Sequence, residues 1–419
     1  MNNRCYKSTD ILLPDFSKTD AKKWAVVACD QFTSEPHYWE AADKEVGDAP
    51  STLRIILPEV YLSETEKRIP SINATMEKYF NEVLVSHPDS MIYTERIQSD
   101  GTVRRGIVLA IDLEAYDFTK GANSLIRATE ATVIERIPPR VAIRKDAPIE
   151  LPHVMLLIDD PDQSVIEPLT MNNGSALAYD TPLMLGGGSI KGRFLTDEEK
   201  SAVSSALDLL ITPEAMKKRY GDASLAPLLF AVGDGNHSLA TAKTIYENIK
   251  AEIGDDALTH PARYALTEVV NIHDPSMKFE PIYRVVFDVD VNDLITKLQN
   301  YVDSLSGDAS EQKIEYISDI ANGTITVKNP VRQLTVGTLQ DFIDSYIKDN
   351  PKASVDYIHG ESSVKSLVSN TSVGFIFSGM NKSELFKTVI YDGALPRKTF
   401  SMGHAEDKRY YLECRKITK

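Results

Sequence analysis

Short apolar runs alternate with amphipathic stretches along the whole chain, and no other sequence feature limits its fold as strongly. The runs Trp24–Ala28, Val154–Ile158 and Leu228–Val232 are five residues long and are bounded by polar or turn residues. Runs this short predict buried strands, because core helices extend over roughly ten residues or more. Between them, apolar residues recur at helical spacing. The alternation predicts a mixed α/β or α+β protein in which helices cover mixed sheets.

The same patterns assign most of the chain to helices and strands. Helices are expected at Pro36–Glu45, Ser63–Leu84, Asp197–Ile211, Pro213–Tyr220, Ser238–Ile253, Val291–Leu305 and Val336–Ile347. Further strands are expected at Leu53–Leu57, Ser90–Ile97, Val103–Ile111, Tyr264–Asn271, Pro281–Val289, Ile314–Ile317, Thr324–Val327, Val355–Ile358, Val373–Phe377 and Arg409–Arg415. A chain of 419 residues has room for about two to three domains. We expect three units, at residues 1–122, 123–290 and 291–419.

Composition excludes several classes of function. Acidic residues outnumber basic ones, 61 to 46, and the formal charge of −15 opposes binding to a nucleic acid backbone. The three cysteines form no disulfide framework, and neither cysteines nor histidines show metal-ligand spacing, so no zinc site is predicted. No apolar run approaches the roughly 18 residues of a membrane span. We therefore expect a reduced, cytoplasmic protein that binds neither nucleic acid nor membrane, and its oligomeric state is left open.

The segment Leu228–Lys243 carries the strongest indication of chemistry. An apolar strand ends at Gly233, a polar turn follows, and Ser238 starts a helix. Glycine lets the backbone approach a ligand closely, and a helix N-terminus offers amide groups and a positive dipole end to an anion. The segment lacks the glycine and lysine spacing of a Walker loop and the spacing of a dinucleotide-binding loop. The turn is therefore a candidate site for a phosphate or a carboxylate of another kind.

Two side chains of this turn have chemistry suited to such a site. Asp234 can hold a metal ion, and His237 can donate to an anion or move a proton. The alternative is an ordinary strand-to-helix turn in which Asn236 or Ser238 only caps the helix.

Two other segments contribute candidate residues. Asp30 follows a buried run, a position that commonly binds ligands in open α/β sheets. Arg127 begins a basic stretch that either lines an anionic pocket or forms a solvated charged edge. The glycines Gly186–Gly188 are followed by no helix, so a hairpin turn is favoured there over a phosphate site.

The blocks Ile126–Thr132 (IRATEAT) and Ala231–Ser238 (AVGDGNHS) are the most specific motifs in the chain. Further blocks are Arg54–Leu62, Arg263–Pro275, Tyr357–Gly360 and Pro396–Thr399. Taken in this order, the set resembles the bacterial and archaeal family called domain of unknown function 1015, over nearly the whole chain. The two specific motifs read Ile-Arg-Pro-His-Glu-x-Thr and Asp-Gly-His-His-Arg in that family.

The same pair of motifs is similar to that of small kinases of free serine in the ParB/sulfiredoxin-like superfamily. This resemblance implies a ParB/sulfiredoxin-like central unit and a site that uses ATP or ADP with Mg²⁺. It implies that Glu130 is the catalytic base and that Asp234, Gly235 and His237 contact phosphate or the metal ion. Such a site is chemically coherent, because a carboxylate takes the hydroxyl proton while positioning and charge neutralisation promote the transfer.

Three positions depart from these motifs. Asn236 and Thr129 stand where the kinases have histidines, and Ser238 stands where they have an arginine. That arginine would neutralise the transferred phosphate. The cationic residues that could replace it are Arg127, Arg140 and Lys243.

The resemblance therefore leaves two readings open. The first is a nucleotide-dependent phosphotransferase acting on a small hydroxylated metabolite, such as free serine or a related amino acid. The second is a nucleotide-binding regulatory protein without turnover, which the three departures would allow. A third, a DNA-partitioning protein, is suggested by the superfamily and opposed by the net charge.

The nucleotide site is expected to form at one cleft. Its binding residues would be Asp30, Arg127, Gly233, Gly235, Asn236 and Ser238, with Asp234 as the metal ligand. The amides of residues 236–238 should point into the cleft. Asp30 and Glu130 should approach Asp234, because binding sites are commonly assembled from several segments.

Overall fold

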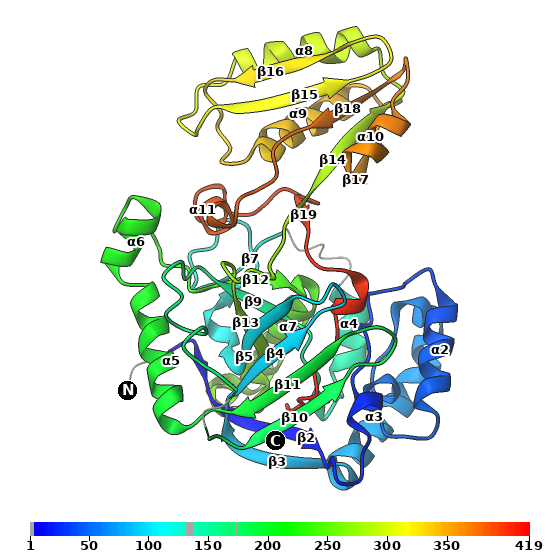
Figure 1. Ribbon diagram of the computed structural model, residues 1–419, viewed down its shortest axis with the longest axis vertical. Helices are drawn as coiled ribbons and strands as arrows, with labels where there is room; N and C mark the ends of the chain where they lie inside the picture. The colour runs from blue at the N-terminus through cyan, green and yellow to red at the C-terminus, as the bar shows by residue number, and fades with distance from the viewer. Residues whose placement is uncertain (1–3, 131–136, 172–173) are drawn as a thin grey trace. The chain divides into compact units, whose positions relative to one another are not determined.

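The computed structural model describes residues 4–130, 137–171 and 174–419. The described residues form two compact units (Figure 1). The first contains those of Met1–Ala128, Thr132–Met277 and Gly403–Lys419, and the second contains those of Thr129–Ala131 and Lys278–Met402. Among all the described residues, none of the helices is long and apolar enough to cross a membrane.

A mixed ten-stranded sheet organises the first unit. Its strand order is β10 (Leu177–Pro182), β11 (Ser189–Phe194), β4 (Ile92–Ile97), β5 (Val103–Asp112), β13 (Tyr264–Asn271), β9 (Met155–Ile158), β12 (Phe230–Asp234), β7 (Ile126–Ala128) and β6 (Tyr116–Asp117), and β1 (Tyr6–Lys7) pairs with β5. Strand β12 runs parallel to β7 and antiparallel to β9. The two motif blocks thus begin as neighbouring parallel strands, with Val232 opposite Ala128.

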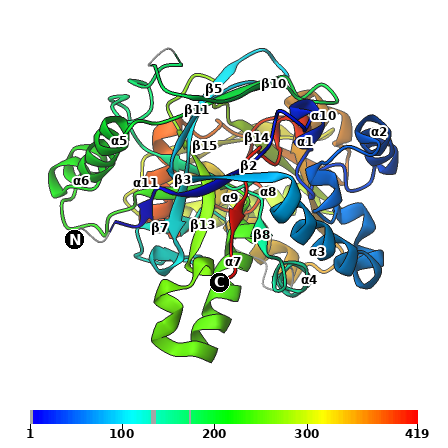
Figure 2. The same ribbon diagram turned by 90° about the horizontal axis from the view of Figure 1, so that it is seen from below.

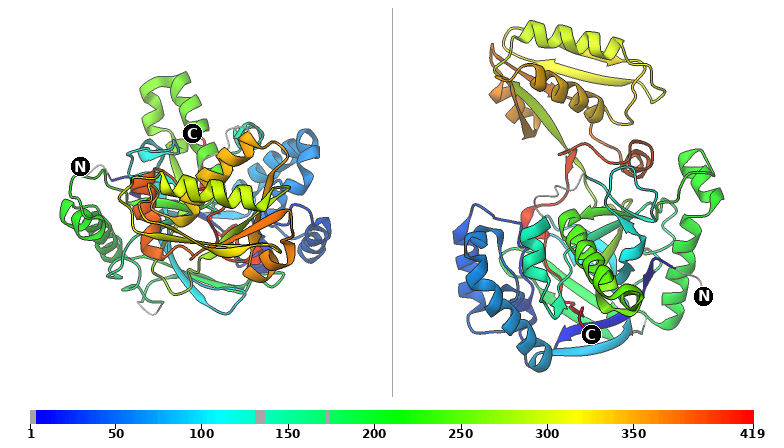
Figure 3. Two further views of the ribbon diagram at one scale, coloured as in Figure 1. Left: turned by 90° about the horizontal axis from the view of Figure 1, so that it is seen from above. Right: turned by 180° about the vertical axis from the view of Figure 1, so that it is seen from behind.

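Helices flank this sheet, as the views from below and behind show (Figures 2 and 3). They are α1 (Ala21–Trp24), α2 (Pro36–Val46), α3 (Thr65–Glu82), α4 (Ile137–Arg144), α5 (Asp197–Leu210), α6 (Pro213–Tyr220) and α7 (Asn236–Ile253). Side chains of successive β5 residues enter different cores, as the alternation of a strand requires. Leu109 packs in one core with Leu207 of α5 and Leu239 of α7. Val108 packs in the other with Met76 of α3.

The last residues of the chain return to the first unit. The amide of Ala28 donates to the carbonyl of Lys408 (2.7 Å), and the amide of Tyr410 donates to the carbonyl of Val26 (3.0 Å). Two small antiparallel ladders lie nearby: β8 (Ile149–Glu150) with β20 (Arg415–Lys416), and β2 (Thr9–Pro14) with β3 (Leu84–Ser90). Residues far apart in sequence are therefore neighbours around Lys408.

The second unit is built on a six-stranded sheet. Its order is β16 (Asn322–Val327), β15 (Gln312–Ile317), β18 (Ser372–Ile376), β14 (Glu280–Phe287) and β17 (Ser354–His359), and β19 (Phe400–Ser401) pairs with β14. Its helices are α8 (Val291–Asp303), α9 (Thr335–Asp349), α10 (Glu361–Leu367) and α11 (Lys382–Asp392). Tyr301 of α8 packs against Phe342 of α9, with ring centroids 5.6 Å apart.

The mixed α/β class is confirmed, and most expected elements are present. Trp24–Ala28 was wrong as a strand, because only Val27 forms a bridge, to Arg409. In place of the strand expected at Arg409–Arg415, the segment forms single bridges at Arg409 and Cys414 and the two-residue strand β20. Leu53–Leu57 was also wrong, because Thr52–Arg54 forms a short 3₁₀ helix capped by Ser51.

The division into units differs from the expected one. Strands β4 and β5, from the expected unit 1–122, lie in the same sheet as β9 and β12, from the expected unit 123–290. The second compact unit begins its long stretch at Lys278 instead of residue 291. Pairing between strands distant in sequence leaves no local sequence signal, which is why composition did not place these boundaries.

The buried carboxyl group of Glu413 leads to a prediction about stability and pH. Burial raises the pKa of Glu413 to about 7, and the hydroxyl of Tyr179 donates to its Oε1 (2.6 Å). Because the folded state binds this proton more tightly than the unfolded state, stability should fall as pH rises from about 4.5 through 7.

Replacing Glu413 by Gln should remove this pH dependence, since the amide stays neutral. We expect the loss of wild-type stability over that interval, about 3 kcal/mol, to be absent in the variant. Urea denaturation of both proteins between pH 5 and pH 8 measures the difference. Parallel stability profiles for the two proteins would contradict the prediction.

Candidate functional site

The turn after β12 has the backbone conformation of a tight ligand-binding loop. Gly235 precedes α7 in the left-handed region, with φ of 84°. A Cβ on Gly235 would lie 3.0 Å from Val154, and one on Gly233 would lie 2.8 Å from Leu157. Both glycines are therefore required by close packing against the strand β9 segment. The helix α7 begins at Asn236, so the backbone amides that start it lie directly after the motif's glycine.

A charged cluster lies beside this turn. The ammonium group of Lys408 is 3.5 Å from Oδ2 of Asp234, and both side chains are 29% exposed. Oδ1 of Asp234 accepts a hydrogen bond from the amide of Gly235 (2.9 Å), which fixes the carboxylate against the turn. One carboxylate and one ammonium group are thus present where α7 begins.

Asp30 belongs to the same cluster. Burial alone would raise the pKa of Asp30, but His153, a hydrogen bond from Gln31 and Lys408 together hold it below its ordinary value. Asp30 is therefore ionised at neutral pH despite its limited exposure. Two carboxylates, from segments about two hundred residues apart, share one lysine.

His153 connects this cluster to α7. Its Nε2 is 2.8 Å from Oγ of Ser238, and its ring packs edge-on against Tyr410 at 4.8 Å between centroids. Burial lowers the pKa of His153, although Asp30 and Asp234 act in the opposite direction. The imidazole is therefore neutral at pH 7. Its buried Nδ1 has no hydrogen-bond partner in the part of the chain that the structure describes.

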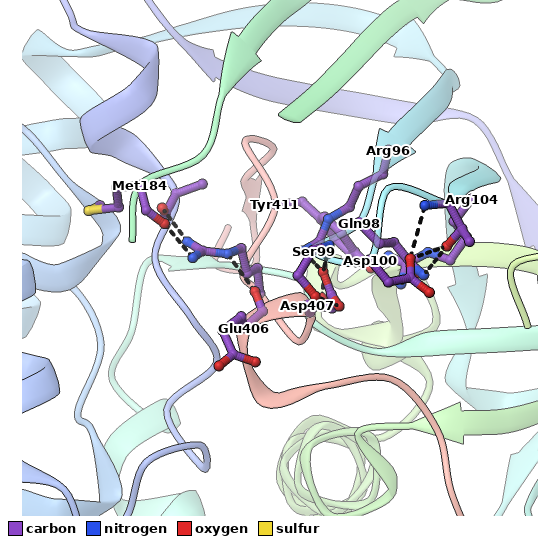
Figure 4. Close-up of polar contacts among 12 residues, drawn as sticks. Arg96, Gln98, Ser99, Asp100, Arg104, Met184, Glu406, Asp407 and Tyr411 are labelled. Atoms are coloured by element: carbon purple, nitrogen blue, oxygen red, sulfur yellow. Dashed lines mark hydrogen bonds and ion pairs between the residues drawn. The ribbon is translucent and has the colours of Figure 1, made fainter. Parts of the chain in front are cut away.

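The residues on both sides of Lys408 are tightly held. Asp407 accepts hydrogen bonds from the amide and hydroxyl of Ser99 (2.9 and 2.7 Å). Arg409 donates to the carbonyls of Met184 (2.5 Å) and Glu406 (2.8 Å). Figure 4 shows these polar contacts around the carboxy-terminal segment. Because its two neighbours are buried and anchored, the backbone of Lys408 has a fixed position beside Asp234.

A cavity with a volume of about 140 Å³ opens next to Ser238 and His153. Its lining is mostly aliphatic and comes from α3, α4, α7, β13 and the segment Ile55–Leu57. Cys29 and Tyr410 also line it. Of the residues Gly233–Ser238 expected to face a cleft, only Ser238 belongs to this lining.

The structure places the other expected site residues differently. Arg127 is buried, and its guanidinium donates to the carbonyls of Ser124 (2.8 Å), Ala226 and Pro227 (2.9 and 3.1 Å). These contacts indicate a structural role for that side chain. Glu130 lies in the second unit, where its backbone forms a bridge to Leu395. Its expected approach to Asp234 stays a prediction.

The two other candidates for the missing arginine are also engaged. Arg140 pairs with Glu59, and Lys243 pairs with Glu247 (2.6 Å) and donates to the carbonyl of Leu113 (2.9 Å). Asn236 and His237 lie in the first turn of α7. The described part of the chain contains no group of three or more His, Cys, Asp or Glu side chains that could hold a metal ion. The expectation that Asp234 binds Mg²⁺ therefore stays a prediction.

Sequence reasoning missed Lys408, His153 and Tyr410. No local motif marks them, because each is brought to the turn by a long-range contact. The apolar run Val154–Ile158, which follows His153, places this histidine just before a strand, and that is the one available signal for it.

Comparison with known proteins identifies relatives of this chain. The model of the family described as protein of unknown function (DUF1015) matches residues 15–416. No curated protein sequence matches the chain. Among solved structures, a conserved hypothetical protein from Pyrococcus furiosus is similar at 11% identity, covering 70% of this chain and 90% of that one, with a TM-score of 0.33.

Structures of a free serine kinase are also similar to this chain. The kinase in complex with AMP has 9% identity over 74% of this chain and 91% of that one, with a TM-score of 0.34. A variant of a free serine kinase in complex with ADP has 9% identity, covers 74% of this chain and 92% of that one, and has a TM-score of 0.35.

Proposed function

This chain belongs to DUF1015, a family of proteins of unknown function, and we propose that it is a nucleotide-dependent phosphotransferase acting on a small hydroxylated molecule. The observation that carries the proposal is the Asp234–Ser238 turn: a glycine loop opens a helix N-terminus beside Asp30, Asp234 and Lys408. Helix amides and a fixed ammonium group suit phosphates, and carboxylates suit their metal ion. In this proposal Gly233, Gly235, Asn236 and Ser238 surround the phosphates.

The proposed reaction moves the terminal phosphoryl group of ATP or ADP. The bond between the terminal phosphorus and its bridging oxygen breaks, a bond to the acceptor oxygen forms, and the hydroxyl proton passes to the carboxylate of Glu130. Mg²⁺ would be held by Asp234 and the phosphates themselves, because this ion commonly binds one or two carboxylates plus substrate phosphates. The role of Glu130 rests on the resemblance of its motif to that of the serine kinases.

Lys408 takes the part of the arginine that the motif lacks at Ser238. Its ammonium group reaches the turn from the carboxy-terminal segment and is already paired with Asp234 (3.5 Å). A bound phosphate would add a further anionic partner to Asp30 and Asp234 without requiring a new cation. Charge-assisted contacts of this kind are about twice as strong as neutral hydrogen bonds.

We expect Lys408→Ala to weaken binding of ADP about 10- to 100-fold, the range for one hydrogen bond to a charged group. Binding of adenosine should be unaffected, because it carries no phosphate. Titration calorimetry measures both, with Lys416→Ala as a control on the same segment and Lys408→Arg as the conservative variant. An equal loss of affinity for ADP and for adenosine, or no loss of affinity for ADP, would show that Lys408 does not contact the phosphates.

His237 gives a prediction about pH. A phosphate near an imidazole favours its protonated form, while the helix dipole, only about half a charge, opposes it less strongly. Nucleotide affinity should therefore fall as pH rises through neutrality. His237→Ala should weaken binding by about 1.5 to 3 kcal/mol and remove most of this pH dependence. A variant that binds ADP like the wild type at every pH would make His237 a structural residue.

The alternative function is nucleotide binding without turnover. The absence of motif residues at Asn236, Ser238 and Thr129 favours it. Thermal-shift measurements with ATP, ADP and Mg²⁺ test both functions, since either predicts stabilisation by nucleotide. Formation of a phosphorylated product from a panel of hydroxylated amino acids and alcohols supports the enzyme, and stabilisation without product supports the regulator. Absence of any stabilisation by nucleotide would contradict both functions.

A further inference from the structure

The cavity beside Ser238 is built for an apolar body. About 140 Å³ is close to the size of cavities that hold a benzene ring. Its walls include Ile55, Leu57, Met76, Ile143, Leu239, Ala242 and Leu266. A molecule that fills such a space gains from removing apolar surface from water.

The charged side chains in the walls already have partners. Arg140 pairs with Glu59, and Arg144 pairs with Glu150, whose Oε1 also accepts from the amide of Leu266 (2.9 Å). The hydroxyl of Thr241 donates to the carbonyl of His237 (2.7 Å). A purine carries several polar atoms on its edge, and each one left unpaired would weaken its binding about fivefold to a hundredfold. The charged groups of free serine would meet the same difficulty.

Polar groups that remain for a ligand are at one end of the cavity. Ser238 belongs both to the lining and to the proposed phosphate-binding turn, and His153 lies against it at 2.8 Å. His153 also lines the cavity, and its enclosed Nδ1 has no partner among the described residues. The hydroxyl of Ser238 can both donate to and accept from the hydroxyl of an alcohol. The apolar body and the hydroxyl of one molecule therefore have complementary surroundings.

We infer that this cavity binds the phosphoryl acceptor, and that the acceptor is an alcohol with a compact apolar body of about benzene size. The part of this inference that makes the ligand a phosphoryl acceptor rests on the proposed function. The cavity's preference for an apolar alcohol does not depend on turnover. The inference excludes free serine as the acceptor. The nucleotide base lies outside the cavity.

Binding of small probes to the full-length protein tests the inference. In ligand-detected NMR, benzyl alcohol should bind the wild-type protein, free serine should not, and adenosine should not displace benzyl alcohol. Ala242→Leu fills the cavity and should weaken benzyl alcohol about tenfold or more. Ala251→Leu makes the same change at an exposed position of the same helix and should leave binding unchanged.

A second variant keeps the inference testable if Ala242→Leu fails to fold. Met76→Ala enlarges the cavity, so naphthylmethanol should gain affinity relative to benzyl alcohol. Displacement of benzyl alcohol by adenosine would assign the cavity to the nucleotide base and overturn the inference. Equal binding of benzyl alcohol to wild type and Ala242→Leu, or none to the wild type, would also overturn it. Failure of the proposed function appears separately, as absence of ADP binding in calorimetry while benzyl alcohol still binds.

Discussion

Replacing Glu130 by Gln should lower the rate of phosphoryl transfer about 10²- to 10⁴-fold, the usual contribution of a general base. The amide cannot take the acceptor's proton, but it keeps the size of the side chain. Nucleotide affinity should therefore stay within about twofold of the wild type, because the carboxylate acts on the acceptor and not on the phosphates.

Turnover and binding are measured on the same preparations, by product formation and by calorimetry. Glu315→Gln, which removes an exposed carboxylate of the second unit, is the matched control and should have wild-type turnover. A Glu130→Gln protein with more than about a tenth of wild-type turnover would show that another group takes the proton.

Replacing Glu268 by Gln should destabilise the protein by about 3 to 5 kcal/mol, because it leaves the buried charge of Arg104 without its partner. Both side chains are buried: Glu268 is fully enclosed, and Arg104 is 5% exposed. An Nη atom of Arg104 lies 2.9 Å from Oε2 of Glu268 and donates to the hydroxyl of Tyr411 (2.9 Å), which in turn donates to Glu268. The hydroxyl of Thr94 donates to the other carboxylate oxygen (3.1 Å).

This network joins β4, β5 and β13 to the carboxy-terminal segment that carries Lys408. Its loss should therefore also loosen the segment beside the turn. Urea denaturation measures the free energy of unfolding, and Glu214→Gln, at an exposed position of α6, is the control. A loss below about 1 kcal/mol for Glu268→Gln would mean that the charge of Arg104 is satisfied by other groups.

Periodicity predicted the elements whose burial pattern is local. Strand β13 has the expected bounds, Tyr264–Asn271, and α6 has the expected bounds, Pro213–Tyr220. The run Trp24–Ala28 is buried as expected, but burial alone does not say whether a strand has a partner on each side. Its strand-like backbone pairing is with residues near 409, almost the whole chain length away, and no local pattern indicates such pairing.

In the candidate site, too, the sequence predicted some residues and missed others. The glycine turn and Asp234 were visible as a motif, because their conformation is determined by adjacent residues. Lys408 and His153 were not, because only the folded chain brings them to the turn. Arg127 differs from both groups: its position in a motif suggested an anion ligand, which stays a prediction, and its guanidinium donates to backbone carbonyls.

The central claim is that nucleotide phosphates bind at the start of α7, and hydrogen–deuterium exchange with ADP and Mg²⁺ tests it most directly. The first amides of a helix lack acceptors within the helix, so a bound phosphate should slow their exchange. The account predicts protection of residues 236–238 on saturation with ADP, and none with adenosine. Protection confined to other segments, or no change at saturating ADP, would contradict it.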